Sequence, residues 1–318
     1  VSMPTVSWLV PWLMVAGGIV MLAKGASWLV DGASRLALRL GVSTFVVGLT
    51  VVGFGTSMPE FSVSLIAALR GNGGLSVGNA VGSNIMNLLL VLGAAAVLAP
   101  VHVVGGKRTL RRDLVFGLVP AVVLLVFAWD GLIERWVAVV LLVIFALFIG
   151  VCLGHARRDS TTPTVVTGHP FRHLALTVLG IVVLVAGSEL MVDGGIDLAH
   201  RFGVSDAVIG LTLVAFGTSL PELATSVAAA LKGQAELSVG NVLGSNIFNL
   251  GLVVGTAFTI RPAQVPGFVI HQDVVILMAA TLLVAVIVLR DGRINRVEGG
   301  IMLLAFAAYM AFVFVRGG

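Results

Sequence analysis

A polar sequence motif occurs twice in this chain, and the two copies lie 162 positions apart. The segments 31–93 and 193–255 align without a gap and share about 38 of 63 residues, which reveals an internal duplication. Each copy holds Gly-Thr-Ser-x-Pro-Glu followed by Gly-Asn-x-x-Gly-Ser-Asn-Ile-x-Asn, and the first copy begins at Gly55, the second at Gly217. Any fold of this chain is therefore built from two similar halves.

The rest of the sequence is suited to a membrane. Hydrophobic residues make up 58% of the chain and charged residues 11%, with a mean hydropathy of +1.10. A soluble domain averages about 25% charged residues, so the composition predicts an integral membrane protein in a lipid bilayer. We interpret the net charge of +4 as basic loop anchors and not as a nucleic-acid-binding surface. The single cysteine, Cys152, excludes an intrachain disulfide and a cysteine-based metal cluster.

Ten apolar runs are long enough to cross a bilayer, which takes about 20 residues. They cover residues 8–38, 43–70, 75–99, 110–129, 132–154, 171–202, 205–232, 237–259, 268–290 and 294–316. A polar stretch with Arg157, Arg158 and Asp159 separates the fifth run from the sixth. The sequence therefore predicts an all-α integral membrane protein with ten transmembrane helices. The first repeat is expected over residues 1–154, a cytoplasmic linker over 155–170, and the second repeat over 171–318.

The number of helices in each repeat decides how the two repeats are oriented. Five is odd, so the second repeat must enter the membrane in the opposite sense to the first, and such inverted repeats with interrupted helices are the architecture of secondary transporters. With the N-terminus outside, the cytoplasmic side holds Arg35, Arg39, Lys107, Arg108, Arg111, Arg112, Arg157, Arg158, Arg172, Lys232, Arg290, Arg293 and Arg296. The outer side then holds Arg70, Arg135, Arg201, Arg261 and Arg316. This positive-inside bias predicts that both termini lie outside.

The first part of the motif predicts a break in the second helix. Pro59 has no N–H, so it deprives a carbonyl one turn earlier of its helical partner and crowds that turn. Free carbonyl oxygens are therefore expected over residues 53–56, and at membrane depth they are tolerated only inside protein or along a cavity. Thr56, Ser57 and Glu60 follow at spacings that let their side chains converge beside the break. Since the second copy has the same pattern, helices 2 and 7 are both expected to be broken.

The second part of the motif adds oxygen donors on the next helix. Ser83 and Asn87 are four residues apart and so share one helix face. The second copy supplies the equivalent set, Thr218, Ser219, Glu222, Ser245 and Asn249. Two carboxylates with hydroxyl, amide and backbone oxygens suit a hard cation such as Ca²⁺, which takes about 6–8 oxygens in flexible geometry. No histidine or cysteine lies in either motif, which argues against a zinc or copper site.

Other residues of the motifs have simpler structural interpretations. The glycines fit the small-xxx-small packing pattern of membrane helices, and they are Gly78, Gly82, Gly240 and Gly244. Four carboxamides are interpreted as hydrogen-bonding groups between helices and not as ligands, namely Asn79, Asn84, Asn241 and Asn246.

The four acidic residues of the duplicated segments divide into two kinds. Asp31 is expected to pair locally with Arg35 or to face water at a helix end, and Asp193 is expected to behave likewise near Arg201. Glu60 and Glu222 differ, because an ionisable group in mid-span costs a few kcal/mol and marks a functional site by default. The recurrence of the glutamate in both copies strengthens this hypothesis.

The two motifs together resemble the two alpha repeats of the cation/calcium antiporter superfamily, and most of all its sodium/calcium exchanger branch. The likeness covers essentially the whole chain and is typical of prokaryotic members, which lack a large cytoplasmic regulatory domain. It implies an alternating-access antiporter in the prokaryotic cell membrane that exchanges Na⁺ for Ca²⁺ without a cofactor. The residues that the resemblance assigns to the ions are Thr56, Ser57, Glu60, Ser83, Asn87, Thr218, Ser219, Glu222, Ser245 and Asn249, with backbone oxygens near Gly53 and Ala215. Relatives often have Asp in place of Asn249, so this chain offers less support for potassium co-transport.

Three other functions stay open at this point. A proton/calcium antiporter would use the same glutamates, although the acidic Gly-Asn-x-x-Glu motif of that branch is absent. A passive cation channel would show flux without countertransport. An intramembrane enzyme is disfavoured, because the sequence has no His-Glu-x-x-His motif and no plausible base near a nucleophile. We expect Na⁺ and Ca²⁺ as substrates, and neither nucleic acid nor a protein partner.

Overall fold

The computed structural model describes residues 4–102, 106–158, 170–202 and 215–317, and almost all of them are helical. The first half contains α1 (Pro4–Leu40), α2 (Thr44–Val47), η1 (Gly48–Val52), α3 (Gly53–Thr56), α4 (Met58–Leu69), α5 (Gly73–Met86), η2 (Asn87–Val91), α6 (Leu92–Leu98), α7 (Gly106–Phe127) and α8 (Arg135–Arg158). The second half contains α9 (Pro170–Arg201), α11 (Ala215–Thr218), α12 (Leu220–Leu231), α13 (Ala235–Ile247), η4 (Phe248–Val254), α14 (Gly255–Ile260), η5 (Val269–Asp273), α15 (Val274–Asp291) and α16 (Arg296–Gly317). The elements labelled η are π-helical turns.

The duplication of the sequence reappears in the element boundaries. The bounds of α3 and α11, and those of α4 and α12, differ by the same 162 positions that separate the motifs. Two short antiparallel ribbons are also present, since β1 (Val101–His102) pairs with β4 (Arg293–Ile294) and β2 (Leu132–Ile133) pairs with β3 (Ala263–Gln264). The strands β1 and β3 lie 162 positions apart, and β2 and β4 lie 161 apart. Each ribbon joins one strand from each half of the chain, so the two halves are tied together at two places.

Seven helices are long and apolar enough to cross a membrane, counting only the described residues. An eighth span is formed if the bent pair Thr44–Thr56 and Met58–Leu69 is counted as one. Of the ten predicted spans, the one at 110–129 is not among these, because α7 carries Arg111, Arg112 and Asp113 near its start. The span at 205–232 and the linker at 155–170 fall partly outside the described residues. The chain is thus a multi-pass helical membrane protein, and the count of ten stays a prediction.

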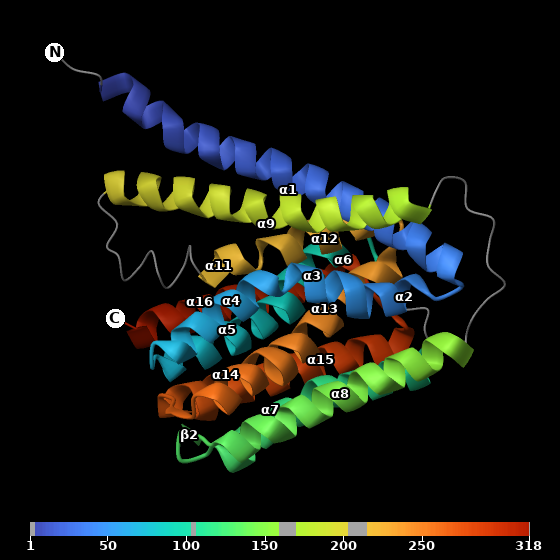
Figure 1. The fold of residues 1–318 in the computed structure, drawn as a ribbon, viewed down its shortest axis with the longest axis vertical. Coiled ribbons are helices and arrows are strands. Elements are labelled where there is room, and N and C mark those ends of the chain that lie inside the picture. Colours follow the sequence, from blue (N-terminus) through green and yellow to red (C-terminus); the bar gives the residue numbers. More distant parts are fainter. Residues whose placement is uncertain (1–3, 103–105, 159–169, 203–214, 318) are drawn as a thin grey trace.

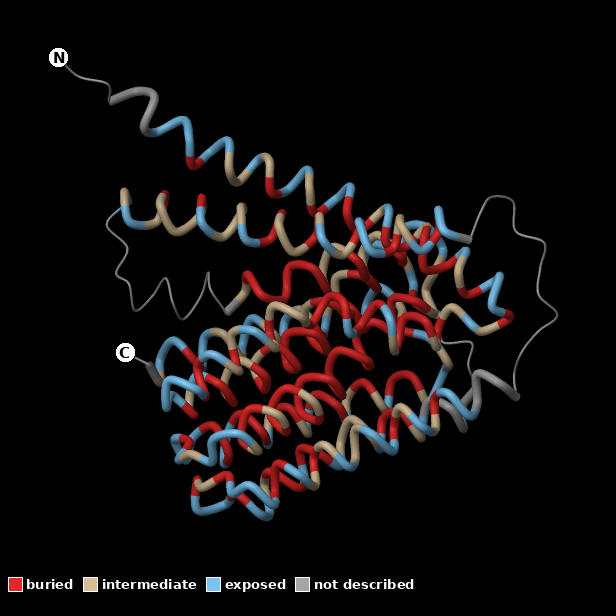
Figure 2. Tube along the Cα trace, in the orientation of Figure 1, coloured by how far each residue is buried: buried red, intermediate tan, exposed pale blue. Residues whose placement is uncertain are grey.

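The two spans that carry the second part of the motif form the centre of the molecule. Within an 18-residue stretch of Ala235–Ile260, 94% of the residues are buried, and within one of Gly73–Leu98 72% are, whereas the same share is 28–44% in the other five helices. Figure 2 shows the same contrast, with buried residues concentrated in the middle of the molecule. The polar motif therefore lies in the most enclosed part of the chain.

The predicted break in the second helix is present. Helix α3 ends at Thr56 and helix α4 begins at Met58, and the axes of Thr44–Thr56 and Met58–Leu69 differ by 47°. Pro59 occupies the first turn of α4, where its missing N–H does no harm and its fixed φ favours helix initiation. In the second half, Ser219 separates α11 from α12 with nearly the same backbone angles as Ser57.

Helices α1 and α9 pack closely against each other along one side of the molecule (Figure 1). Glycines at seven-residue intervals line their contact, Gly18, Gly25 and Gly32 on α1 and Gly180, Gly187 and Gly194 on α9. A Cβ atom on Gly180 would lie 2.5 Å from the backbone nitrogen of Leu29, and one on Gly25 would lie 2.8 Å from that of Leu184. The absence of side chains at these positions is what lets the two backbones meet.

The packing role predicted for the motif glycines holds for the second copy. A Cβ atom on Gly240 would lie 2.4 Å from the carbonyl oxygen of Phe45, and one on Gly244 would lie 2.3 Å from that of Leu49. Among the described residues nothing lies within 4 Å of a Cβ built on Gly78 or Gly82. The segment that would repeat this contact in the second half is outside the described residues, so for these two glycines packing stays a prediction.

Candidate functional site

Two glutamates stand at the starts of the two helices that follow the breaks. Glu60 lies in the first turn of α4 and Glu222 in the first turn of α12, and both side chains are fully buried. A helix N-terminus carries a partial positive charge, which favours a carboxylate in its first turn. The pattern Ser-x-Pro-Glu sets this position, because the proline fixes where the helix begins and the glutamate follows directly.

Each glutamate is bound by a serine from the opposite half of the chain. Ser57 Oγ donates to Glu222 Oε1 at 3.0 Å, and Ser219 Oγ donates to Glu60 Oε1 at 3.2 Å. This exchange brings both breaks together and places both carboxylates in one cluster. The structure thereby joins four predicted site residues that are far apart in sequence.

The next helices add hydroxyl groups to the same cluster. Ser245 Oγ donates to Glu222 Oε1 at 3.3 Å and lies 3.4 Å from the carbonyl oxygen of Gly53. Its counterpart Ser83 is buried and lies beside Glu60. The two serines differ in their contacts, since Ser245 bonds its glutamate whereas Ser83 Oγ has no hydrogen-bond partner among the described residues.

The threonines of the motif bind asparagines across the two halves. Thr56 Oγ1 lies 3.1 Å from Asn241 Oδ1, and Thr218 Oγ1 lies 3.5 Å from Asn79 Oδ1. The two threonines were predicted as ion ligands, and the two asparagines were predicted as hydrogen-bonding groups between helices. The hydrogen-bonding role of the asparagines is confirmed.

The prediction of free carbonyl oxygens at the first break is wrong for Gly53. Its carbonyl oxygen accepts the backbone N–H of Ser57 at 3.1 Å and lies 3.4 Å from each of the hydroxyl oxygens of Thr56 and Ser245. The chain turns tightly enough at Ser57 to keep this helical hydrogen bond across the break. The carbonyl oxygen is a shared acceptor at the edge of the cluster and is not left unpaired.

Several buried oxygens of the cluster accept no hydrogen bond. Among the described residues, no donor lies within hydrogen-bonding geometry of these atoms: Glu60 Oε2, Glu222 Oε2, Asn87 Oδ1 and Asn249 Oδ1. Buried acceptors without partners are rare and costly. All four belong to predicted ion ligands, and all four are hard oxygens. A cation would satisfy them together.

Neutral oxygens outnumber charged ones in this cluster. Within the described ranges no three His, Cys, Asp or Glu side chains come together. Any ion at this place would be held by two carboxylates and by hydroxyl and carboxamide oxygens, a mixed set that suits Ca²⁺ and Na⁺ better than softer metals.

The predicted partner of Asp31 is wrong. Asp31 Oδ1 lies 2.8 Å from Lys232 Nζ, at the end of α12, and this ammonium group also donates to Ser27. The sequence suggested Arg35, which is one helical turn away, but the fold brings Lys232 to the same place. Arg201, which was suggested for Asp193, forms an ion pair with Asp197, with Arg201 Nε 2.9 Å from Asp197 Oδ1. Asp193 itself is exposed, as the alternative expectation had it.

Two features near the site were not predicted. The π-helical turn η2 begins at Asn87, and η4 contains Asn249, so both carboxamides lie where the helix is locally wider. Single π-helical turns are frequent at functional sites, but no residue pattern in the sequence identified them. The second feature is Ser188 of α9, whose hydroxyl donates to the carbonyl oxygen of Gly217 at the second break.

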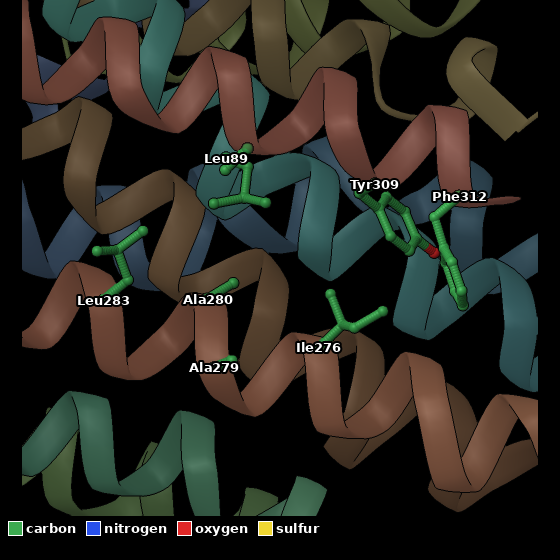
Figure 3. A pocket seen from close by; sticks show the side chains of 8 residues that line it. Leu89, Ile276, Ala279, Ala280, Leu283, Tyr309 and Phe312 are labelled. Atoms are coloured by element: carbon green, nitrogen blue, oxygen red, sulfur yellow. The ribbon is translucent and has the colours of Figure 1, made fainter.

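A separate pocket lies away from these polar groups. Figure 3 shows it between α15, α16 and η2, with a volume of about 300 Å³. Its lining residues are Leu89, Ile276, Ala279, Ala280, Leu283, Ala305, Tyr309 and Phe312. Such an apolar lining offers no ligands for a cation, so the carboxylate cluster remains the candidate site.

The hydrogen bonds that Ser57 and Ser219 donate to the glutamate of the opposite half predict the effect of removing either hydroxyl. Ser57→Ala and Ser219→Ala should weaken Ca²⁺ binding by similar factors, because each removes one hydrogen bond to a buried glutamate. A hydrogen bond to a charged group contributes about 1.5–3 kcal/mol, so a loss of roughly 10- to 100-fold is expected in calorimetric titrations. Ser62→Ala on α4 is the matched control, since the Ser62 hydroxyl bonds to the carbonyl of Met58 on the exposed side. Unequal effects of the two serine variants would contradict the equivalence of the two halves.

Comparison with known proteins gives consistent matches over almost the entire chain. The family model described as sodium/calcium exchanger protein matches residues 10–154 and 172–315. CaxA from Alkalimonas amylolytica is 40% identical over 96% of this chain and 99% of its own length. The sodium/calcium exchanger MaX1 from Methanosarcina acetivorans is 31% identical over 96% of this chain and 99% of its own.

A solved structure shows the same fold. The sodium-calcium exchanger NCX_Mj, in a structure soaked with Na⁺ and Sr²⁺, superposes with a TM-score of 0.85 at 32% sequence identity. The superposition covers 95% of this chain and 98% of that one.

Proposed function

The chain belongs to the sodium/calcium exchanger protein family, and on this premise we propose that it is a secondary antiporter that exchanges Na⁺ for Ca²⁺ by alternating access. One observation carries the proposal. Glu60 and Glu222 are fully buried, each bound by a serine of the opposite half, and each keeps one oxygen without a hydrogen bond among the described residues. This arrangement supplies charge and ligands for a cation inside the membrane.

The two glutamates would share their ions with the surrounding neutral oxygens. One Ca²⁺, or several Na⁺, would occupy the cluster, with ligands from Glu60, Glu222, Thr56, Ser57, Ser83, Asn87, Thr218, Ser219, Ser245 and Asn249. Because the ligands are shared, the two kinds of ion compete and are not bound together at full occupancy. Competition for one site that opens alternately to each side couples the two fluxes.

We place this site between two inverted repeats of five helices, in a multi-pass protein of the cell membrane. The two β-ribbons support this arrangement, because each pairs a strand of the first half with one of the second. The strands β1 and β3 lie 162 positions apart, and β2 and β4 lie 161 apart. The pair α1 and α9 is the candidate for the moving part, since these long helices pack mainly on each other (Figure 1). Ser188 on α9, which bonds to the second break, would connect this movement to the site.

The sidedness of the chain can be tested with introduced cysteines. We predict that Ser160→Cys is labelled from the cytoplasmic side and that Asp130→Cys, at an exposed position beyond α7, is labelled from outside. The native Cys152 is fully buried and should give little background. Labelling of residue 160 from outside alone would contradict the proposed orientation.

The nearest alternative is a proton/calcium antiporter using the same glutamates. Ca²⁺ uptake into proteoliposomes separates the possibilities. Vesicles loaded with Na⁺ and diluted into Na⁺-free buffer should accumulate Ca²⁺, whereas vesicles loaded with K⁺ should not. Uptake driven by a pH gradient without Na⁺ would identify proton coupling, and Ca²⁺ entry that needs no counter-ion would identify a channel.

The charge of the site predicts how the exchange responds to voltage. Two ionised glutamates carry −2, so one Ca²⁺ neutralises the site and three Na⁺ leave a charge of +1. A cycle that exchanges three Na⁺ for one Ca²⁺ would move one net charge, worth about 2.3 kcal/mol per 100 mV. We expect Na⁺-driven Ca²⁺ uptake to change when valinomycin and K⁺ clamp the membrane potential at different values. Uptake that is independent of the clamped potential would indicate exchange of two Na⁺ and would contradict this stoichiometry.

A further inference from the structure

Four asparagines form a continuous hydrogen-bonded network where α5 and α13 meet. Asn84 and Asn246 are at its centre, and Asn87 and Asn249 are at its two ends. Asn84 Nδ2 donates to the backbone oxygen of Asn246 at 2.9 Å, and Asn246 Nδ2 donates to the backbone oxygen of Asn84 at 3.2 Å. Asn87 Nδ2 donates to Asn246 Oδ1 at 3.1 Å, and Asn249 Nδ2 donates to Asn84 Oδ1 at 3.0 Å. Every one of these bonds crosses from one half of the chain to the other.

The hydrogen bonds of this asparagine network fix the orientation of its carboxamides. A backbone carbonyl can only accept, so the amide nitrogen of Asn246 must face Asn84 and its Oδ1 atom must face Asn87. That oxygen in turn requires the amide nitrogen of Asn87, because two oxygens would repel each other. The Oδ1 atom of Asn87 is therefore directed away from the network. By the same reasoning, the bond from Asn249 Nδ2 to Asn84 Oδ1 directs the Oδ1 atom of Asn249 away from the network.

The oxygens that are left over belong to the candidate ion site. Asn87 Oδ1 and Asn249 Oδ1 are buried and have no hydrogen-bond partner among the described residues. Asn249 follows Ser245 by one turn, and Ser245 donates to Glu222. A carboxamide turned the other way would present N–H groups, which repel a cation and attract an anion.

We infer that Asn84 and Asn246 are positioning residues that hold the carboxamide oxygens of Asn249 and Asn87, respectively, toward the transported cation. They contact no ion themselves, and each acts on the ligand of the opposite repeat. This inference rests on the proposed function, since it assigns the two outward oxygens to a cation. It also explains why each motif has two asparagines three residues apart, one that positions and one that binds.

The asparagine network predicts which residues are energetically coupled in Ca²⁺ binding. Asn84 should be coupled to Asn249, and Asn246 to Asn87, although in sequence Asn84 is the neighbour of Asn87. Residues that orient a ligand typically change metal affinity by about 10- to 100-fold when they are removed. Once the ligating side chain is removed, substitution of its positioning residue should have little further effect on Ca²⁺ affinity.

The experiment is a set of double-mutant cycles on the purified full-length protein, with Ca²⁺ affinity measured by calorimetry. Asn84→Ala and Asn249→Ala should each weaken Ca²⁺ binding by roughly 10- to 100-fold. The double variant should bind within about twofold of Asn249→Ala alone, because independent effects would multiply. The matched control is Asn84→Ala with Asn87→Ala, where the two losses should multiply.

Thermal unfolding without Ca²⁺ separates positioning from mere support of the fold. If Asn84→Ala lowers the melting temperature but leaves Ca²⁺ affinity unchanged, or if its effect multiplies with that of Asn249→Ala, the positioning role is wrong. If Asn84→Ala does not give folded protein, Asn84→Ser takes its place in the cycle, because the shorter hydroxyl cannot reach the Asn249 nitrogen. A wild-type protein that binds no Ca²⁺ would instead contradict the proposed function itself.

Discussion

Glu60→Gln and Glu222→Gln are each expected to abolish Na⁺-driven Ca²⁺ uptake. Each keeps the size of the side chain and one oxygen but removes half of the negative charge that a divalent ion needs on leaving water. Removing one partner from a buried, compensated set of charges costs about 3–5 kcal/mol, which corresponds to a loss of Ca²⁺ affinity of roughly 100- to 4,000-fold. Na⁺ binding should suffer less, because the cost of dehydration grows steeply with charge.

The two variants should also behave alike and stay folded. In the absence of ions, each substitution removes one of two fully buried carboxylate charges, and a buried charge is costly, so the melting temperature should not fall. Asp31→Asn is the matched control, because Asp31 forms an ion pair with Lys232 at the end of α12, away from the cluster. Near-normal uptake by Glu60→Gln together with loss of uptake in Asp31→Asn or Asp193→Asn would place the site on the wrong residues.

Gly180→Val should cause the largest loss of stability among single substitutions in the α1–α9 contact. A Cβ atom at this position would lie 2.5 Å from the backbone nitrogen of Leu29 and 2.8 Å from its Cα. Backbone atoms cannot move aside as a flexible side chain can, so the two helices must separate. Overpacking costs about 1–3 kcal/mol or more, and we expect about 3 kcal/mol here.

A matched glycine distinguishes this clash from a general effect of valine in a membrane helix. Gly150 lies in α8, and nothing among the described residues lies within 4 Å of a Cβ built on it. Thermal unfolding in detergent should therefore show a clear decrease for Gly180→Val and little change for Gly150→Val. Equal decreases would mean that close contact between the two backbones does not stabilise the pair.

The sequence predicted the features that follow from local chemistry. Pro59 and the glycines before it predicted the break, and the structure has it between Thr56 and Met58. The hydrogen-bonding role of Asn84 and Asn246 followed from their polarity inside a buried helix, and their mutual bonds confirm it. Such features depend on a few neighbouring residues, which is why they can be inferred without a fold.

Features that depend on contacts between distant segments could not be predicted. Asp31 was assigned to Arg35 because only local partners are visible in a sequence, whereas the fold supplies Lys232. The carbonyl of Gly53 was expected to be free, yet it accepts the backbone N–H of Ser57, and the hydroxyl of Ser245 from the other half also reaches it. The glycines of α1 and α9 recur at seven-residue intervals in the sequence, but their meeting requires the two helices to lie side by side.

The crossed contacts explain why the duplication matters for the site. Neither half alone surrounds its own glutamate, since Glu60 is bound by Ser219 and Glu222 by Ser57. The threonine–asparagine and asparagine–asparagine bonds cross in the same way. The cluster therefore exists only when the two halves are packed together, and a movement of one half against the other would alter all of its ligands at once.

Competition between Na⁺ and Ca²⁺ for binding to the purified protein tests the central claim most directly, because the account places both ions on the same two glutamates. Calorimetric Ca²⁺ titrations at increasing Na⁺ concentration, with K⁺ or choline keeping the ionic strength constant, give the apparent affinity. The account predicts that the apparent dissociation constant for Ca²⁺ rises with Na⁺ more steeply than in direct proportion, since several Na⁺ replace one Ca²⁺. A Ca²⁺ affinity that is the same in Na⁺ as in choline would contradict a shared site.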